Sequence, residues 1–162
     1  MYINSIIVAI SKNNGIGKNN ELLFNIKEDM LFFKKTTLNK TIVMGRKTFE
    51  SLPNVLQQRK HIVITRDKDY TVNHPMVEIR HSLLDVLEEF NHQESEVCII
   101  GGGQIYKQAL DTGLVDRLYI TRIDKYVDDV DTFFPNISDY SYSIVNEITL
   151  NEDAIVQVYE KK

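Results

Sequence analysis

Strand-length apolar runs alternate with helical segments along most of this chain. Residues 5–11 form an almost continuous apolar run, which is typical of a strand covered on both faces. The other predicted strands are residues 41–44, 61–65, 77–80, 97–100 and 117–123, and the predicted helices are residues 26–37, 47–52, 82–90 and 102–109. Residues 141–148 and 154–161 alternate around a polar turn, which predicts an antiparallel hairpin. The pattern predicts an α/β fold, with a mostly parallel central sheet flanked by helices and an antiparallel C-terminal hairpin.

Length and charge narrow the class of protein. The 162 residues predict one domain, residues 1–162. A net charge of −4 argues against binding to nucleic acid or to an anionic membrane surface. Cys98 is the only cysteine, which excludes an intrachain disulfide and a cysteine-rich metal site, and no metal is expected. The sequence has neither a signal-peptide pattern nor a membrane-length apolar run, so a cytoplasmic location is expected.

Asp29 is a carboxylate on the apolar side of a predicted helix. At 100° per residue, Ile26, Met30 and Phe33 fall within about 60° of one another, and Asp29 lies between Phe33 and Phe32. Burying an unpaired carboxylate is costly, and no basic residue stands three or four positions away. Asp29 therefore either charges the first helical turn or meets a partner from elsewhere in the fold or from a ligand.

Three predicted strands end in residues that suit an anion. These ends are Gly45-Arg46-Lys47-Thr48, Thr65-Arg66 and Gly101-Gly102-Gly103-Gln104. Each one alone could be a tight turn or a solvated helix end. Carboxyl ends of parallel strands share one edge of a sheet, however, and glycine-rich helix starts bind phosphate through backbone N–H groups. Two separated cationic ends suit a dinucleotide with an extra phosphate, which favours NADPH over NADH.

Familiar nucleotide motifs do not fit these ends. Tyr106 stands where a Rossmann fingerprint needs its third glycine. A Walker loop fails because Arg46 follows Gly45 and Lys40 holds the place of the first glycine. A receiver-type domain needs clustered acids after its first strand, where residues 11–13 carry none. The sequence therefore indicates a phosphate binder of another class.

Six segments occur together at the spacing of one known family. They are Gly15-Ile16-Gly17-Lys18, Phe32-Phe33-Lys34, Met44-Gly45-Arg46-Lys47-Thr48-Phe49-Glu50-Ser51, Ile100-Gly101-Gly102-Gly103, Tyr119-Ile120-Thr121 and Asp131-Thr132-Phe133-Phe134-Pro135. On these residues the chain resembles the bacterial single-domain dihydrofolate reductases over essentially its whole length. The resemblance implies NADPH-dependent reduction of 7,8-dihydrofolate to 5,6,7,8-tetrahydrofolate, with hydride to C6 and a proton to N5, in one-carbon and thymidylate metabolism. The alternative is a pyrimidine reductase of riboflavin synthesis, which shares the fold and cofactor but needs neither Asp29 beside Phe33 nor Arg59.

The resemblance also implies a substrate site. Asp29 would accept hydrogen bonds from the 2-amino group and N3 of the pteridine, and Arg59 would bind the α-carboxylate of the substrate's glutamate. Desolvation should raise the pKa of Asp29. The implied substrate-binding residues are Ile7, Val8, Asp29, Met30, Phe33, Leu52, Leu56, Arg59, Ile100 and Thr121. The residues implied to act in catalysis are Leu22, Phe24, Asp29 and Thr121.

A cofactor site and a mobile loop are implied in the same way. Residues 15–24 would close over the nicotinamide, and Asp131 would hold that loop. The Gly101–Gly102 peptide bond would be cis. The implied cofactor-binding residues are Val8, Ile16, Gly17, Asn20, Leu22, Gly45, Arg46, Lys47, Thr48, Thr65, Arg66, Ile100, Gly101, Gly102, Gly103, Gln104, Ile105 and Tyr106.

The chain departs from the family before the acidic helix. Leu23-Phe24 stands where the family usually has Pro-Trp, and Gln57-Gln58 stands where Pro-Gly is common. We therefore expect weaker binding of diaminopyrimidine antifolates, as in resistance-type enzymes. Antifolates and dihydrofolate are the expected small-molecule partners, and the chain is expected to be monomeric. The four histidines, His61, His74, His81 and His92, are expected to be structural or on the surface.

Overall fold

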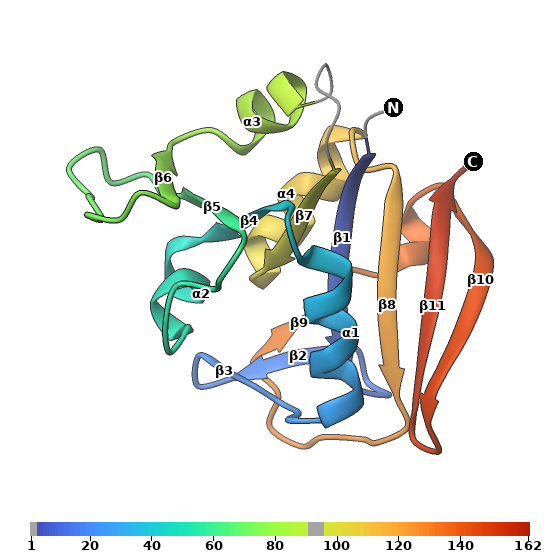
Figure 1. Ribbon diagram of the computed structural model, residues 1–162. Coiled ribbons are helices and arrows are strands. Elements are labelled where there is room, and N and C mark those ends of the chain that lie inside the picture. Colours follow the sequence, from blue (N-terminus) through green and yellow to red (C-terminus); the bar gives the residue numbers. More distant parts are fainter. Residues whose placement is uncertain (1–2, 91–95) are drawn as a thin grey trace.

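A computed structural model of the chain describes residues 3–90 and 96–162. The main sheet contains β1 (Ile3–Ile10), β4 (Thr41–Gly45), β5 (Lys60–Ile64), β6 (Val77–Arg80), β7 (Glu96–Gly101), β8 (Arg117–Ile123), β10 (Tyr142–Asn151) and β11 (Ala154–Lys161). Its strand order is β10-β11-β8-β1-β7-β4-β5-β6 (Figure 1). Neighbours from β8 to β6 pair in parallel, whereas β11 pairs antiparallel with both β8 and β10. The predicted α/β fold with an antiparallel C-terminal hairpin is confirmed.

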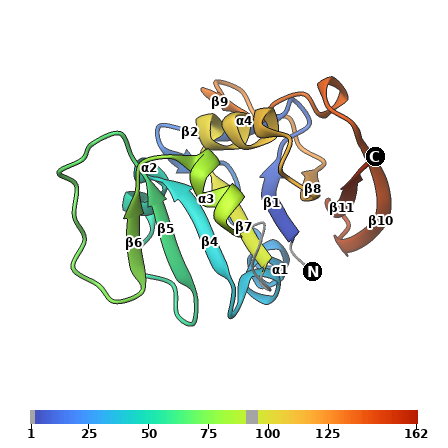
Figure 2. The ribbon, with the colours of Figure 1, turned by 90° about the horizontal axis from the view of Figure 1, so that it is seen from above.

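Helices cover both faces of this sheet. They are α1 (Lys27–Thr37), α2 (Arg46–Ser51), α3 (Leu83–Phe90) and α4 (Gly103–Thr112). Figure 2 shows α1 and α4 on opposite sides of the sheet. The larger apolar cluster contains residues of α3 and α4, and the smaller cluster takes Phe32 and Phe33 from α1. Alternation along β1 divides its side chains between the clusters, with Ile6 and Val8 in the larger and Ile7 in the smaller.

Part of the loop implied at residues 15–24 belongs to a small second sheet. It contains β2 (Gly15–Lys18), β3 (Glu21–Leu22) and β9 (Thr132–Phe133), with β2 in the middle. The implied loop therefore contains two short strands, β2 and β3, that were not predicted. Strands this short carry too little alternation to be recognised, and β2 finds its partner β9 more than a hundred residues later.

Cys98 and one of the four histidines lie in the core. Cys98 in β7 is fully buried, and burial raises the pKa of its thiol to about 12. His61 is also fully buried: its Nδ1 lies 2.9 Å from the carbonyl oxygen of Arg59, and its Nε2 accepts from the N–H of Leu56 at 3.1 Å. His74 and His81 are exposed, and His92 lies outside the described residues. None of the described helices is both long and apolar enough to cross a membrane.

Candidate active site

The three strand ends that were predicted to bind an anion lie side by side. β4 lies between β5 and β7, with Gly45 opposite Ile64 and Met44 opposite Gly101. The predicted meeting of these ends is therefore confirmed, as is the cis peptide bond between Gly101 and Gly102. A Cβ on Gly45 would lie 3.1 Å from Ile105, and one on Gly102 would lie 3.4 Å from Thr48. The N-caps of α2 and α4 are glycines, so no side chain caps either helix start. This edge therefore offers backbone N–H groups to a diphosphate.

Asp29 is hydrogen-bonded to a residue that is distant in the sequence. Thr121 Oγ1, on β8, donates a hydrogen bond of 2.8 Å to Asp29 Oδ1. Burial raises the pKa of Asp29, although the bond from Thr121 acts in the opposite direction. Glu28 faces outward and instead accepts a 3.1 Å hydrogen bond from Asn151. Asp29 is therefore the inward carboxylate of α1, and Glu28 is the surface one.

Most of the predicted apolar wall lies on one face. Ile7 belongs to the smaller cluster, and Phe33, Leu52, Leu56 and Ile100 pack against it. Sequence reasoning missed Ala9, which lies two positions after Ile7 on β1, is partly exposed and stands opposite Thr121 in the register. The two-residue alternation of a strand is the signal that could have found it.

Three predicted site residues do not contribute to this wall. The side chain of Val8 packs in the larger cluster, on the face opposite Phe33, because adjacent strand residues point in opposite directions. Met30 is 58% exposed and lines a surface groove of about 430 Å³ with Lys27 and Leu31. The inward stripe of α1 is instead Asp29, Phe32, Phe33 and Thr37, so the predicted wheel was rotated by about one residue. Leu22, on β3, is 86% exposed.

Arg59 is a buried cation beside this wall. It is 6% exposed, and its Nε and Nη1 donate to the carbonyl of Gln57 at 2.9 Å and to Thr37 Oγ1 at 3.2 Å. Desolvation lowers the pKa of its guanidinium. Within residues 3–90 and 96–162, no carboxylate lies within ion-pair distance of it. Arg59 is therefore suited to a carboxylate that comes from a ligand.

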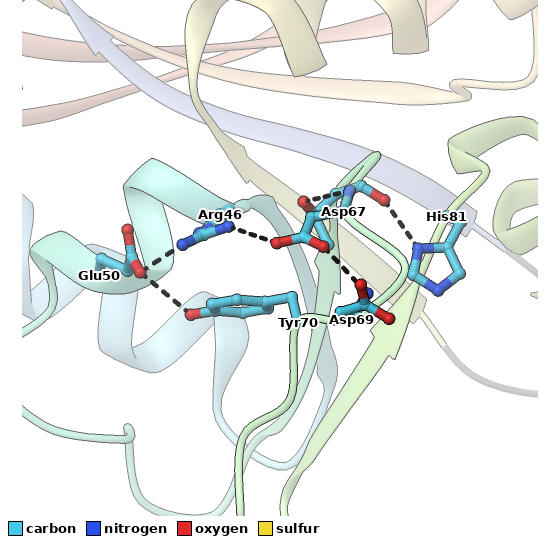
Figure 3. Close-up of polar contacts among 7 residues, drawn as sticks. Arg46, Glu50, Asp67, Asp69, Tyr70 and His81 are labelled. Atoms are coloured by element: carbon cyan, nitrogen blue, oxygen red, sulfur yellow. Dashed lines mark hydrogen bonds and ion pairs between the residues drawn. The ribbon is translucent and has the colours of Figure 1, made fainter.

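Arg46 lies in a network that the sequence analysis did not anticipate (Figure 3). Its Nε lies 3.3 Å from Glu50 Oε2, its Nη1 lies 3.2 Å from Asp67 Oδ2, and its guanidinium lies 4.1 Å from the centre of the Tyr70 ring. The spacing of four residues could have identified Glu50, but nothing local identifies Asp67. Lys47, which follows Arg46, and Arg66, which precedes Asp67, are both exposed.

The start of α4 separates into exposed and supporting residues. Gln104 is exposed, whereas Ile105 and Tyr106 are buried. The hydroxyl of Tyr106 donates to the carbonyl of Ile7 at 2.8 Å, and burial raises its pKa. A Cβ on Gly101 would lie 3.4 Å from that hydroxyl. Tyr106 therefore supports the glycine turn from beneath and does not present its hydroxyl to a ligand.

The small sheet brings the predicted loop against the glycine turn. A Cβ on Gly103 would lie 2.8 Å from Thr132 Cγ2 and 3.8 Å from Ile16 Cδ1. Asp131 accepts a 2.8 Å hydrogen bond from the N–H of Asn19 and donates its own N–H to Gly17. This is the contact through which Asp131 can hold the loop. Asn20, also assigned to the cofactor, is exposed and has a φ of 62°.

Comparisons with known proteins agree with this geometry. The dihydrofolate reductase family model matches residues 3–160. The chain is 40% identical to a dihydrofolate reductase of Buchnera aphidicola over 87% of its own length and 82% of that protein. It is 35% identical to dihydrofolate reductase type 1 of Escherichia coli over 97% and 98% of the two chains.

This chain belongs to the dihydrofolate reductase family. A solved dihydrofolate reductase from Enterococcus faecalis, complexed with NADP(H) and RAB-propyl, superimposes with a TM-score of 0.87 at 29% identity, covering 98% of this chain and 96% of that one. As a dihydrofolate reductase, the chain is an NADPH-dependent oxidoreductase that reduces dihydrofolate to tetrahydrofolate. The riboflavin-pathway alternative is not favoured.

Proposed function

We propose that the face between α1, α2 and the sheet binds 7,8-dihydrofolate with the pteridine edge on Asp29. The hydrogen bond from Thr121 to Asp29, beside the wall formed by Ile7, Phe33 and Ile100, carries this assignment. A half-buried carboxylate with one oxygen held by Thr121 can accept from an amino group and a ring N–H side by side. Oxidation of NADPH by the purified protein in the presence of dihydrofolate is the direct test, and its absence would refute the assignment.

The residues of the chain act mainly by positioning and electrostatics. NADPH, when bound, supplies the hydride for C6 of dihydrofolate. Asp29 orients the pteridine and, as an anion, favours protonation of N5 by solvent water. Arg59 binds the glutamate α-carboxylate, and the loop that carries Leu22 and Phe24 closes over the site and excludes water.

The adjacent strand ends form the proposed NADPH site. Gly101 to Gly103, with Gln104, would hold the diphosphate, because their backbone can approach it closely and the start of α4 carries no side-chain cap. The ribose 2′-phosphate would be held by residues at and just after the ends of β4 and β5. Those residues are Gly45, Arg46, Lys47, Thr48, Thr65 and Arg66.

Replacing Arg46 by alanine tests the phosphate assignment. The Michaelis constant for NADPH should rise by about tenfold or more, as expected for the loss of a charge-assisted bond. The constant for NADH should change little, because NADH lacks the phosphate. Steady-state kinetics with both cofactors measure the difference, and equal effects on both would remove Arg46 from the phosphate site.

The junction before α1 leads us to propose weakened binding of diaminopyrimidine antifolates. Phe24 is half-buried after β3 and has no side-chain N–H with which to hold an ordered water. Phe24→Trp should therefore tighten trimethoprim binding by a few-fold, which is the usual value of one neutral hydrogen bond. Inhibition constants for both proteins provide the comparison. A wild-type constant equal to that of a sensitive enzyme contradicts the proposal.

We further propose that residues 1–162 act as a single domain, as a monomer and in the cytoplasm.

A further inference from the structure

We propose that Asp67 and Glu50 set the strength of this enzyme's preference for NADPH over NADH, because they orient Arg46 and also compete with the cofactor phosphate for its charge. The inference rests on the proposed phosphate site and deepens it. Its basis is the network of Arg46, Glu50, Asp67 and Tyr70 in Figure 3.

The network holds the guanidinium of Arg46 from three sides. Nε donates to Glu50, Nη1 donates to Asp67, and the guanidinium lies over the ring of Tyr70, whose hydroxyl donates to Glu50 at 3.3 Å. An arginine has five N–H donors. These contacts use two of them and leave the outer edge, one N–H of Nη1 and both of Nη2, for a phosphate. The arginine is thus oriented before a cofactor arrives.

The carboxylate of Asp67 is itself held in place. Its Oδ1 accepts the N–H of Asp69 at 2.9 Å, and its own N–H donates to Thr65 Oγ1 at 3.2 Å. Asp67 therefore cannot turn away when a second anion binds Arg46 without losing local hydrogen bonds. A phosphate on Arg46 must lie close to this carboxylate.

Orientation and repulsion act in opposite directions, and repulsion is the larger effect. Asp67 and Arg46 are both nearly half exposed, and an ion pair of this kind is worth at most about fivefold. Part of that value survives in Asp67→Asn, because the single amide oxygen of asparagine can still accept from Arg46 in place of Oδ2, although the Asp69 N–H then loses its acceptor. A carboxylate about 6 Å from a phosphate dianion, screened by salt, weakens binding by about three- to tenfold. Removing the charge of Asp67 should therefore strengthen NADPH binding.

The test uses equilibrium binding, which does not depend on turnover. Dissociation constants of NADPH and NADH are measured calorimetrically for the wild type, Asp67→Asn, Glu50→Gln and Arg46→Ala. The matched control is Asp139→Asn, which changes net charge equally. Asp139 ends η1 (Ile137–Asp139), just before β10 at the opposite edge of the sheet from β5 and β6. Thermal unfolding of each variant verifies folding.

We expect Asp67→Asn to lower the dissociation constant of NADPH about three- to tenfold, and by more at low salt. The dissociation constant of NADH should stay within about twofold of the wild-type value. Glu50→Gln should act in the same direction.

If Arg46→Ala selectively weakens binding of NADPH but Asp67→Asn does not strengthen it, the inference is wrong and the phosphate site stands. An equal gain in Asp139→Asn also overturns it, because net charge alone would then be the cause. If Arg46→Ala has no selective effect, the proposed phosphate site itself fails, and the inference fails with it.

Discussion

Asp29→Asn should fold and yet lose turnover with dihydrofolate by about 2–4 kcal/mol in activation free energy, the usual value of one preorganised electrostatic group. Asparagine keeps an oxygen that can accept from Thr121, so the local geometry should survive. What it removes is the negative charge that holds the pteridine edge and favours protonation at N5. Single-turnover rates at neutral pH measure the loss. The matched control is Glu28→Gln, on the outward side of the same helical turn, which should keep wild-type turnover.

The same variant has a second, opposite effect on stability. Burial raises the pKa of Asp29 in the folded protein above its value in the unfolded chain. Such a group contributes stability that is fully present below the unfolded pKa and is lost as pH rises through the folded pKa. Asp29→Asn should therefore be more stable than the wild type at neutral pH, and the difference should shrink in acid. Thermal unfolding across this pH range measures it. Near wild-type turnover at neutral pH would contradict the assigned role, and a less stable variant would contradict the raised pKa.

Arg59→Ala should raise the Michaelis constant for dihydrofolate by about ten- to a hundredfold, which corresponds to a charged hydrogen-bonding group worth 1.5–3 kcal/mol. Arg59 is 6% exposed and lacks an ion-pair partner among the described residues, so a substrate carboxylate would be its main counter-charge. Kinetics with dihydropteroate, which has the pterin and aminobenzoyl groups but no glutamate, separate binding from folding. Its Michaelis constant should change far less.

Two results would decide against this role for Arg59. An equal loss with both substrates would mean that Arg59 acts only through its hydrogen bonds to Thr37 and Gln57, which support the wall. A similar loss in Lys60→Ala, which removes the adjacent exposed cation, would indicate a general charge effect.

The long-range framework of this fold is predictable from sequence because strand periodicity and glycine positions are local signals. β6 and β8 have the predicted bounds, and the three glycine or cationic strand ends meet as expected. Side-chain direction is less predictable. The facing of α1 was misjudged at Met30 because helix rotation depends on how Phe32 and Phe33 pack against the sheet, which no local pattern records.

Some contacts between distant segments were beyond sequence reasoning. β2 pairs with the nearby β3 and also with β9, more than a hundred residues later, and Asp67 reaches Arg46 because β4 and β5 are neighbours. The bond between Asp29 and Thr121 could be expected from the resemblance, but helix periodicity alone could not choose between a helix-end charge and a functional carboxylate. For Tyr106 the sequence position was misleading. Its place beside the glycines suggested contact with a ligand, but its hydroxyl donates to the carbonyl of Ile7.

The position of β1 between β7 and β8 has a consequence for folding during synthesis on the ribosome. β1 pairs at Ile3 with Glu96 and at Ser5 with Arg117, so it has no partner in the main sheet until residues about ninety positions later have emerged. Late closure of this kind favours slow folding and a long period in which apolar strands are unpartnered. Thr121, the partner of Asp29, lies on β8 and emerges after Glu96 and Arg117. A nascent chain therefore cannot complete the surroundings of Asp29 until β8 has joined the sheet, and we expect substrate binding to begin only then.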